Sequence, residues 1–385
     1  RGGGLDAALD AFALAFGLGA VRGRAEVLLG LGRVTEARDA AAAAVAEARR
    51  TDETAALASA LSDQALVEAV ANGPVAVKHA AASVRVWRRA GEDALDWPPL
   101  FSLGLALERA DRYDECLDTL TELRAWLDSR GLLDQVPRCV RTEVTAAFLG
   151  GRWARMEEAL AAAIDVRRDE PNHEMGPIWA AYAALAAARG DERGRRRGLE
   201  RSREALAART TPFDRALSAW WRSLGHAMRL ELREAYTASL EAVDSAISLG
   251  AANLVSRSVP GLAMLTGVLG VEPVMDLDAV FRDSAAGGTR PSLPAGELLV
   301  TAFTTSDSPR RALIEAAELY SGTENRLGMV LTLACVEFTP GPDAIPTRLG
   351  EAAREIAASL SMNDALVAAL MGGAPAHAAV RSHLP

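Results

Sequence analysis

The amino-acid sequence predicts an all-α protein, a right-handed superhelical solenoid built from stacked pairs of helices. Half of the residues are hydrophobic but only 5% are aromatic, and the alanine and leucine that dominate them are the best helix formers. No segment shows the alternation of apolar and polar residues that a half-buried strand requires. Turns containing glycine or aspartate recur at nearly constant intervals along most of the chain.

The stretch from Leu100 to Leu123 shows the predicted unit most clearly. Its first helix carries an apolar stripe formed by Leu103, Gly104 and Leu107. Its second helix carries a stripe formed by Tyr113, Cys116, Leu117 and Leu120. Asp111 and Arg112 form the polar turn between the two helices. A hairpin this short cannot bury either stripe alone, so it needs neighbours of the same kind.

Helical periodicity continues on both sides of this hairpin. An amphipathic helix is expected over residues 5–16, and a helix pair follows around Gly32. The remaining apolar patterns predict helices over residues 53–71, 76–87, 144–148, 156–164, 179–188 and 199–206, a hairpin over 220–247, and helices over 310–320, 326–336, 347–360 and 364–370.

The predicted turns are evenly spaced. They lie at Gly32, Gly73, Asp111, Gly151 and Gly190. Successive turns are about 40 residues apart, and such a fixed period is the signature of stacked helical repeats, of which about nine fit the chain. We therefore expect helical repeats over residues 1–284, an irregular loop or hinge over 285–294, further repeats over 295–371 and a tail over 372–385. The glycines and prolines of 285–294 favour the loop.

Composition excludes several classes of partner and compartment. The net charge of -9 and the pI of about 5.3 argue against direct nucleic-acid binding, which requires a basic surface. Cys116, Cys139 and Cys335 form no CxxC pair, and their odd number fits a reducing cytoplasm. No apolar run reaches the ~18 residues that span a membrane. We therefore expect a cytoplasmic protein that does not bind membranes.

Motifs for catalysis are missing from the sequence. Lys78 is the only lysine and does not follow a glycine-rich turn, so no phosphate-binding loop is present. The five histidines do not show the HExxH spacing of zinc ligands. The acidic loop around His173 fits a solvated loop better than a metal or acid–base site. We predict no catalytic residue, no metal ligand and no cofactor.

The order Leu103-Gly104, Leu107, turn, Tyr113, Cys116 resembles the tetratricopeptide (TPR) pattern. The period here is about 40 residues, whereas that of the standard TPR is about 34 residues. Long, degenerate repeats of this kind are similar to the C-terminal regions of large bacterial ATP-binding transcription regulators. These include the maltose-regulator and LuxR-type regulators and the actinobacterial antibiotic regulators. Residues 308–334 are similar to a typical late repeat of these proteins.

This resemblance implies a non-catalytic module that binds a protein segment or an effector and serves as the sensor region of a bacterial transcription regulator. Nucleotide-binding and DNA-reading modules of such a regulator would lie outside this chain, as its other domains. A stand-alone scaffold or adaptor that docks peptides is the alternative, and an enzyme built on a helical solenoid is the third possibility.

The resemblance also implies a binding surface, because the first helix of each TPR pair lines the concave face. Counting from the Leu-Gly position predicts that the ligand-binding residues are Phe101, Arg138, Arg141, Phe148, Arg222, His226, Arg229 and Arg257. Arginine binds carboxylate and phosphate with two parallel hydrogen bonds. We therefore expect an acidic peptide, a terminal carboxylate or a small acidic effector as the ligand. The alternative is that these arginines pair with glutamates of neighbouring helices.

Overall fold

The computed structural model describes residues 25, 28–29, 31–73, 75–166, 174–208, 211–339 and 341–362. Within these residues the chain forms 17 α-helices and no strand, which confirms the predicted all-α class. The helices expected over 5–16 and 364–370, and the tail over 372–385, lie outside the described residues.

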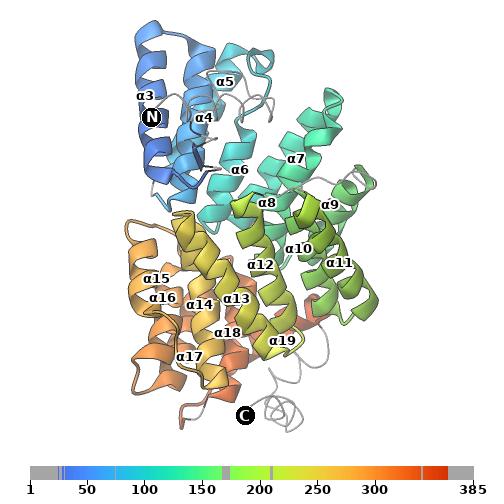
Figure 1. Ribbon diagram of the computed structural model, residues 1–385, viewed down its shortest axis with the longest axis vertical. Coiled ribbons are helices and arrows are strands. Elements are labelled where there is room, and N and C mark those ends of the chain that lie inside the picture. Colours follow the sequence, from blue (N-terminus) through green and yellow to red (C-terminus); the bar gives the residue numbers. More distant parts are fainter. Residues whose placement is uncertain are drawn as a thin grey trace.

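The helices follow one another in pairs (Figure 1). The N-terminal part contains α3 (Val34–Thr51), α4 (Thr54–Val70), α5 (Ala76–Ala90), α6 (Leu100–Arg109), α7 (Tyr113–Ser129), α8 (Val136–Leu149) and α9 (Trp153–Val166). The middle contains α10 (Met175–Arg189), α11 (Glu192–Ala208), α12 (Pro212–Ala227) and α13 (Leu232–Ser248). The C-terminal part contains α14 (Ala252–Leu269), α15 (Leu277–Ala285), α16 (Leu293–Thr304), α17 (Pro309–Ser321), α18 (Arg326–Phe338) and α19 (Thr347–Ser359).

The same backbone cap recurs at seven positions along the described residues. A residue with positive φ stands at Gly32, Asn72, Asp111, Gly151, Gly190, Leu230 and Gly270. Successive caps are about 40 residues apart. At each of them the next N–H donates to the carbonyl four residues before the positive-φ residue, as from Arg112 to Leu107 at 3.0 Å. This is the Schellman arrangement, in which a left-handed residue satisfies the last carbonyls of a helix.

Asn72 and Asp111 depart from the glycine that a left-handed cap favours, and both have side chains that reach the C-terminal half. Asn72 Nδ2 donates to the Ser284 carbonyl at 3.1 Å. Asp111 Oδ2 accepts from the Ser292 amide at 2.9 Å. Asparagine and aspartate tolerate the left-handed region better than other non-glycine residues. These two positions therefore combine the turn with a long-range polar contact.

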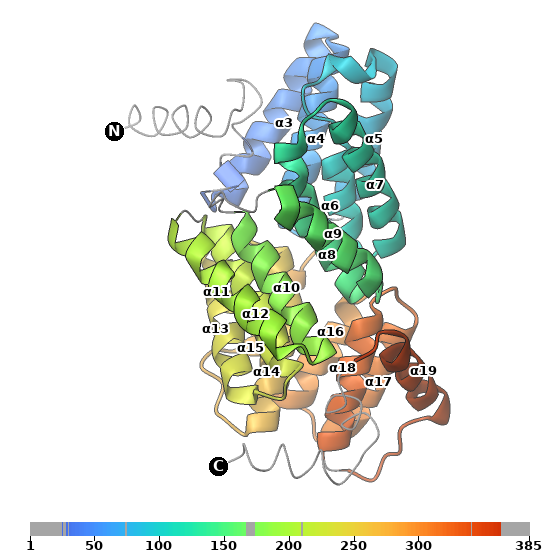
Figure 2. The same ribbon diagram turned by 90° about the vertical axis from the view of Figure 1, so that its right-hand side faces the viewer.

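The two halves of the chain pack against each other. Figures 1 and 2 place α3–α7 towards one end of the long axis and α14–α19 towards the other, and α4 contacts α14 while α8 contacts α18. Residues 286–292 of the predicted irregular segment connect α15 to α16 and lie at this junction, since Ser292 bonds to Asp111. Helices of the N-terminal part therefore contact helices of the C-terminal part directly.

A large aromatic group fills the core where the N-terminal and middle helices meet. The Phe148 ring stacks on Trp153 at 5.3 Å and meets Trp221 edge-on at 5.1 Å between ring centroids. All three side chains are at most 1% exposed. Such pairs add to the stabilisation that comes from burying their area, so α8, α9 and α12 are fixed against one another.

The close approach of α6 and α7 generates the first testable prediction. A Cβ atom added to Gly104 would lie 2.6 Å from Leu120 Cδ2, and Leu120 is completely buried. We expect Gly104→Leu to lower the free energy of unfolding by about 1–3 kcal/mol, because the core would be overpacked. Urea denaturation measures this change.

Gly261→Ala in α14 is the matched control, since a Cβ atom there meets no heavy atom within 4 Å. It should stabilise the protein by up to about 1 kcal/mol through helix propensity. Equal stability of wild type and Gly104→Leu would contradict the packing described for α6 and α7.

Candidate functional site: a buried ionic cluster beside a central cavity

The structure pairs several of the predicted ligand-binding residues with acids of the same chain. Arg141 Nη1 lies 2.7 Å from the buried carboxylate of Asp214. Arg222 Nη2 lies 2.6 Å from Glu241, and His226 Nδ1 lies 2.7 Å from Glu231. The alternative interpretation was that these arginines pair with glutamates of neighbouring helices, and Arg222 with Glu241 of α13 is such a pair. Arg141 pairs with an aspartate instead, and the partner of His226 lies in the turn before α13.

The two predicted phenylalanines do not lie on an open face. Phe101 is 3% exposed and Phe148 is completely buried, because the neighbouring helices cover the inner faces of α6 and α8. The Arg138 guanidinium lies 4.9 Å from the centre of the Phe101 ring, so these two predicted residues do meet.

Arg229 is also among the predicted residues. Its Nε is buried and finds no hydrogen-bond partner among the described residues.

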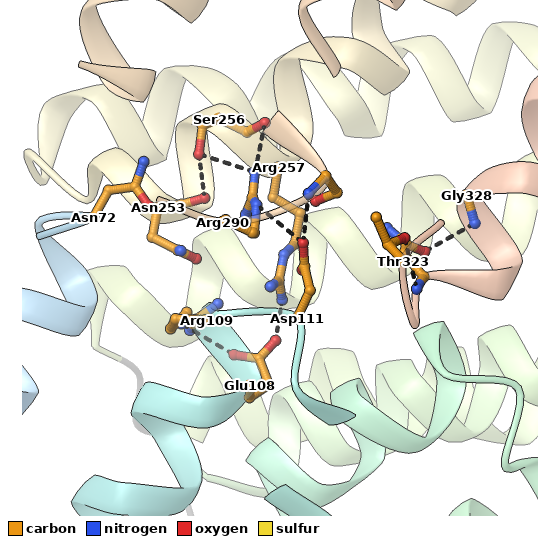
Figure 3. Close-up of polar contacts among 12 residues, drawn as sticks. Asn72, Glu108, Arg109, Asp111, Asn253, Ser256, Arg257, Arg290, Thr323 and Gly328 are labelled. Atoms are coloured by element: carbon orange, nitrogen blue, oxygen red, sulfur yellow. Dashed lines mark hydrogen bonds and ion pairs between the residues drawn. The ribbon is translucent and has the colours of Figure 1, made fainter. Parts of the chain in front are cut away.

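Arg257 is the predicted residue that the structure places in an interior site. It belongs to what we call the interior ionic cluster, which consists of Glu108, Arg109, Asp111, Arg257 and Arg290 (Figure 3). Arg257 Nη1 bonds to Glu108 Oε1, and Arg109 Nε lies 3.1 Å from Glu108 Oε2. Side chains of α6 and α14, separated by 149 residues, therefore meet inside the protein.

Arg290 is held by an interruption of helix α14. Pro260 lies inside this helix, and proline has no N–H to donate to the carbonyl four residues earlier. That carbonyl belongs to Ser256, and Arg290 Nη2 donates to it at 3.3 Å. Arg290 Nε lies 3.9 Å from Asp111 Oδ2. Pro260 thus leaves the Ser256 carbonyl without its helical donor, and Arg290 of the 286–292 loop donates to it instead.

Positive charge exceeds negative charge in this cluster. Within the described part of the chain it contains three arginines and two carboxylates, with side chains at most 9% exposed. Burial raises the pKa of Glu108, but Arg109 and Arg257 outweigh this effect and hold the pKa below its usual value of 4.5. Burial lowers the pKa of Arg109 to about 10, against the opposite effect of Glu108, so Arg109 remains charged at neutral pH.

A cavity adjoins the arginines. Its walls come from α7, α8, α12, α13, α14, α16, α17 and α18, from Asp111 and from the 286–292 loop, and its volume is about 120 Å³. Arg257 and Arg290 line it together with serines and many apolar side chains. A few polar groups among apolar side chains are the usual features of a small-molecule site.

Glu108, Arg109, Asp111 and Arg290 were missed as site residues by the sequence analysis. Two local signals could have pointed to them. Asp111 occupies a left-handed cap position where glycine is favoured, which indicates a use for its side chain. Pro260 within an otherwise regular helical pattern leaves a carbonyl that needs a donor. Neither signal identifies the partner.

The comparisons with known proteins add no relative. A scan against protein-family models finds no match, and a search of curated proteins finds none. Among the described residues, none of the helices is both long and apolar enough to cross a membrane.

The ionic cluster generates a prediction for Glu108→Gln. This change leaves Arg109 and Arg257 buried without their counter-charge, and we expect it to cost about 3–5 kcal/mol of unfolding free energy. Glu122→Gln is the control, because Glu122 forms an exposed pair with Arg88 worth at most about 1 kcal/mol. Chemical denaturation of both variants measures the difference, and equal losses would contradict a special role of Glu108.

The pH dependence of the same variant provides a second readout. Because the folded protein lowers the pKa of Glu108, its stabilisation is complete above the unfolded value of 4.5 and is lost as pH falls through the lower folded value. The unfolding free energy of the wild type should therefore fall below pH 4.5. Glu108→Gln should show a shallower fall.

Asp111→Gly tests whether the cap or the long-range contact matters more. Glycine would relieve the left-handed backbone at φ 56°, but the Ser292 amide and the Tyr113 hydroxyl would lose their acceptor. Each unsatisfied buried donor costs about 1–3 kcal/mol, so we expect a net loss of stability in thermal unfolding. Asp111→Asn keeps an acceptor and should lose less. A glycine variant as stable as the wild type would show that the contact is dispensable.

Proposed function

We propose that this chain is a non-catalytic binding module, built as a right-handed solenoid of TPR-like helix pairs with a period of about 40 residues. The observation that carries this proposal is the recurrence of one helix cap at a nearly constant interval, at seven positions of the described residues. A repeated cap supports a repeated supersecondary unit. The proximity of Gly104 to Leu120 also supports the TPR frame.

We propose further that the module senses an acidic effector in the cytoplasm for a bacterial transcription regulator. The link to regulation rests on the resemblance of residues 308–334 to a late repeat of such regulators. The acidic ligand is supported by the surplus of arginine in the interior ionic cluster. The three free, buried cysteines are compatible with a reducing compartment.

A small effector has more support than a docked peptide. The contacts of α4 with α14 and of α8 with α18 occupy inner faces that an extended peptide would need. The space that remains beside Arg257 is a cavity of molecular size. This distribution of space favours the sensor over the alternative of a stand-alone peptide-docking scaffold.

The function is tested by ligand-induced thermal stabilisation. We expect at least one compound in a panel of small organic acids to raise the melting temperature, because a ligand that binds the folded state stabilises it by mass action. The matched amides, which lack the charge, serve as controls. A panel of acidic peptides should give no larger shift. Stabilisation by peptides alone would favour the scaffold, and chemical conversion of a bound compound would favour an enzyme.

The regulatory role has a separate test in the coding sequence that precedes Arg1. We expect it to encode a nucleotide-binding module with a phosphate-binding loop of the GxxxxGK[ST] type. A gene that encodes only the helical chain would contradict the proposed regulatory role, while the proposal of a binding module would stand.

A further inference from the structure

The lining of the cavity beside the interior ionic cluster combines charged and polar groups with apolar side chains. Arg257, Arg290 and Ser258 lie among its polar lining. The rest of the wall is largely apolar and includes Trp220, Leu224, Met264, Leu299 and Leu331. A molecule that fills this space would therefore meet two arginines as well as apolar side chains.

Arg257, Arg290 and Ser258 of the cavity lining carry hydrogen-bond donors that have no acceptor in the described chain. Arg257 Nη2 and Arg290 Nη1 and Nε are buried, and no residue of the described chain accepts a hydrogen bond from them. The Ser258 hydroxyl is also buried and has no hydrogen-bond partner in the described chain. The two arginine side chains are 8% and 5% exposed. Buried donors of this kind are normally satisfied, so Arg257 and Arg290, which line the cavity, have N–H groups left to donate to an acceptor.

The charge of the cluster indicates which acceptor fits. Glu108 and Asp111 neutralise two of the three arginines, which leaves one surplus positive charge. Tyr113 and Tyr320 also line the cavity, and burial raises the pKa of both, that of Tyr320 to about 12. They therefore stay neutral at physiological pH. A single carboxylate balances the site, whereas a phosphate dianion would leave excess negative charge in a buried place.

We infer that this cavity binds a small organic monocarboxylate, whose carboxylate group accepts hydrogen bonds from Arg257 and Arg290 and whose apolar body lies along α12, α14 and α18. This inference deepens the proposed sensor function and rests on it for biological meaning. Charge-assisted bonds from two guanidinium groups to one carboxylate are among the strongest polar contacts in proteins.

The size of the cavity sets the length of the ligand. Its volume of about 120 Å³ is roughly ten times the ~10–15 Å³ that holds one water molecule. A carboxylate with a short aliphatic chain is of this order. Butanoate, hexanoate and octanoate are therefore suitable probes, and the corresponding neutral amides have nearly the same shape.

The test is isothermal titration calorimetry of the full 385-residue chain with these six compounds. We expect at least one carboxylate to bind and its amide to bind at least about tenfold more weakly, because the amide lacks the charge that strengthens each bond. Failure of all three carboxylates to bind, or equal binding of acid and amide, would overturn the inference.

Gly261 offers a steric variant that leaves the arginines intact. It lines the cavity, and a Cβ atom added there meets no heavy atom within 4 Å. We expect Gly261→Leu to fold normally and to weaken binding at least about tenfold by filling the space, while Gly261→Ala binds nearly as the wild type does. Unchanged binding by Gly261→Leu would place the ligand elsewhere and overturn the assignment.

Arg290→Gln tests the arginine contact, because glutamine can still donate to the Ser256 carbonyl but carries no charge. It should remove the preference for acid over amide, and a retained preference would contradict the assignment. Urea denaturation shows whether this variant folds, and Gly261→Leu decides the question if it does not. Two outcomes separate this inference from the proposed sensor function. If the carboxylates bind but the upstream gene encodes no regulator module, the proposed sensor function is wrong and this inference stands.

If other acids stabilise the protein but none of the three probes binds, this inference is wrong and the proposed function stands.

Discussion

The carboxylate of Asp111 connects a helix cap of this protein to its interior. The residue closes helix α6 in a left-handed conformation. Its two oxygens accept hydrogen bonds from the Tyr113 hydroxyl at 2.8 Å and from the Ser292 amide at 2.9 Å. It also faces Arg290. One side chain thus fixes the α6–α7 turn against a loop that lies 181 residues away, and the interior ionic cluster forms around this contact.

Specific pairing is the main consequence of burying these charges. A buried ion pair gives little net stability, because the loss of hydration offsets the Coulomb attraction. Breaking such a pair is nevertheless expensive. A shifted register between the N-terminal and C-terminal halves would separate Glu108 from Arg257 and leave both charges buried without partners. The cluster therefore discriminates against other arrangements of the same helices, while the apolar contacts of the core supply most of the stability.

Local sequence patterns made the helices and turns predictable. The site was not predictable, because its residues lie far apart in the sequence. The hairpin around Asp111 and the turns at Gly32, Gly151 and Gly190 follow from apolar periodicity and turn residues, which are properties of short segments. The structure forms α6 and α7 on either side of the expected turn. The partner of Arg257 lies on α6, however, and no short segment encodes that meeting. Counting within a repeat identified Arg257 but treated the inner face as open, so Phe101 and Phe148 were expected on a surface.

The position of the cavity gives the proposed sensor a physical route to a response. Its walls include the Asp111 turn of the N-terminal half and helices α14, α16 and α18 of the C-terminal half. A ligand that satisfies Arg257 and Arg290 would favour the arrangement in which these groups converge, and only in proportion to its difference in affinity between arrangements. Its binding energy would then add to the contacts of Asn72 and Asp111 that hold the halves together. Occupancy of a small interior space would in this way control the relation between two large surfaces, which is what a module that reports to neighbouring domains requires.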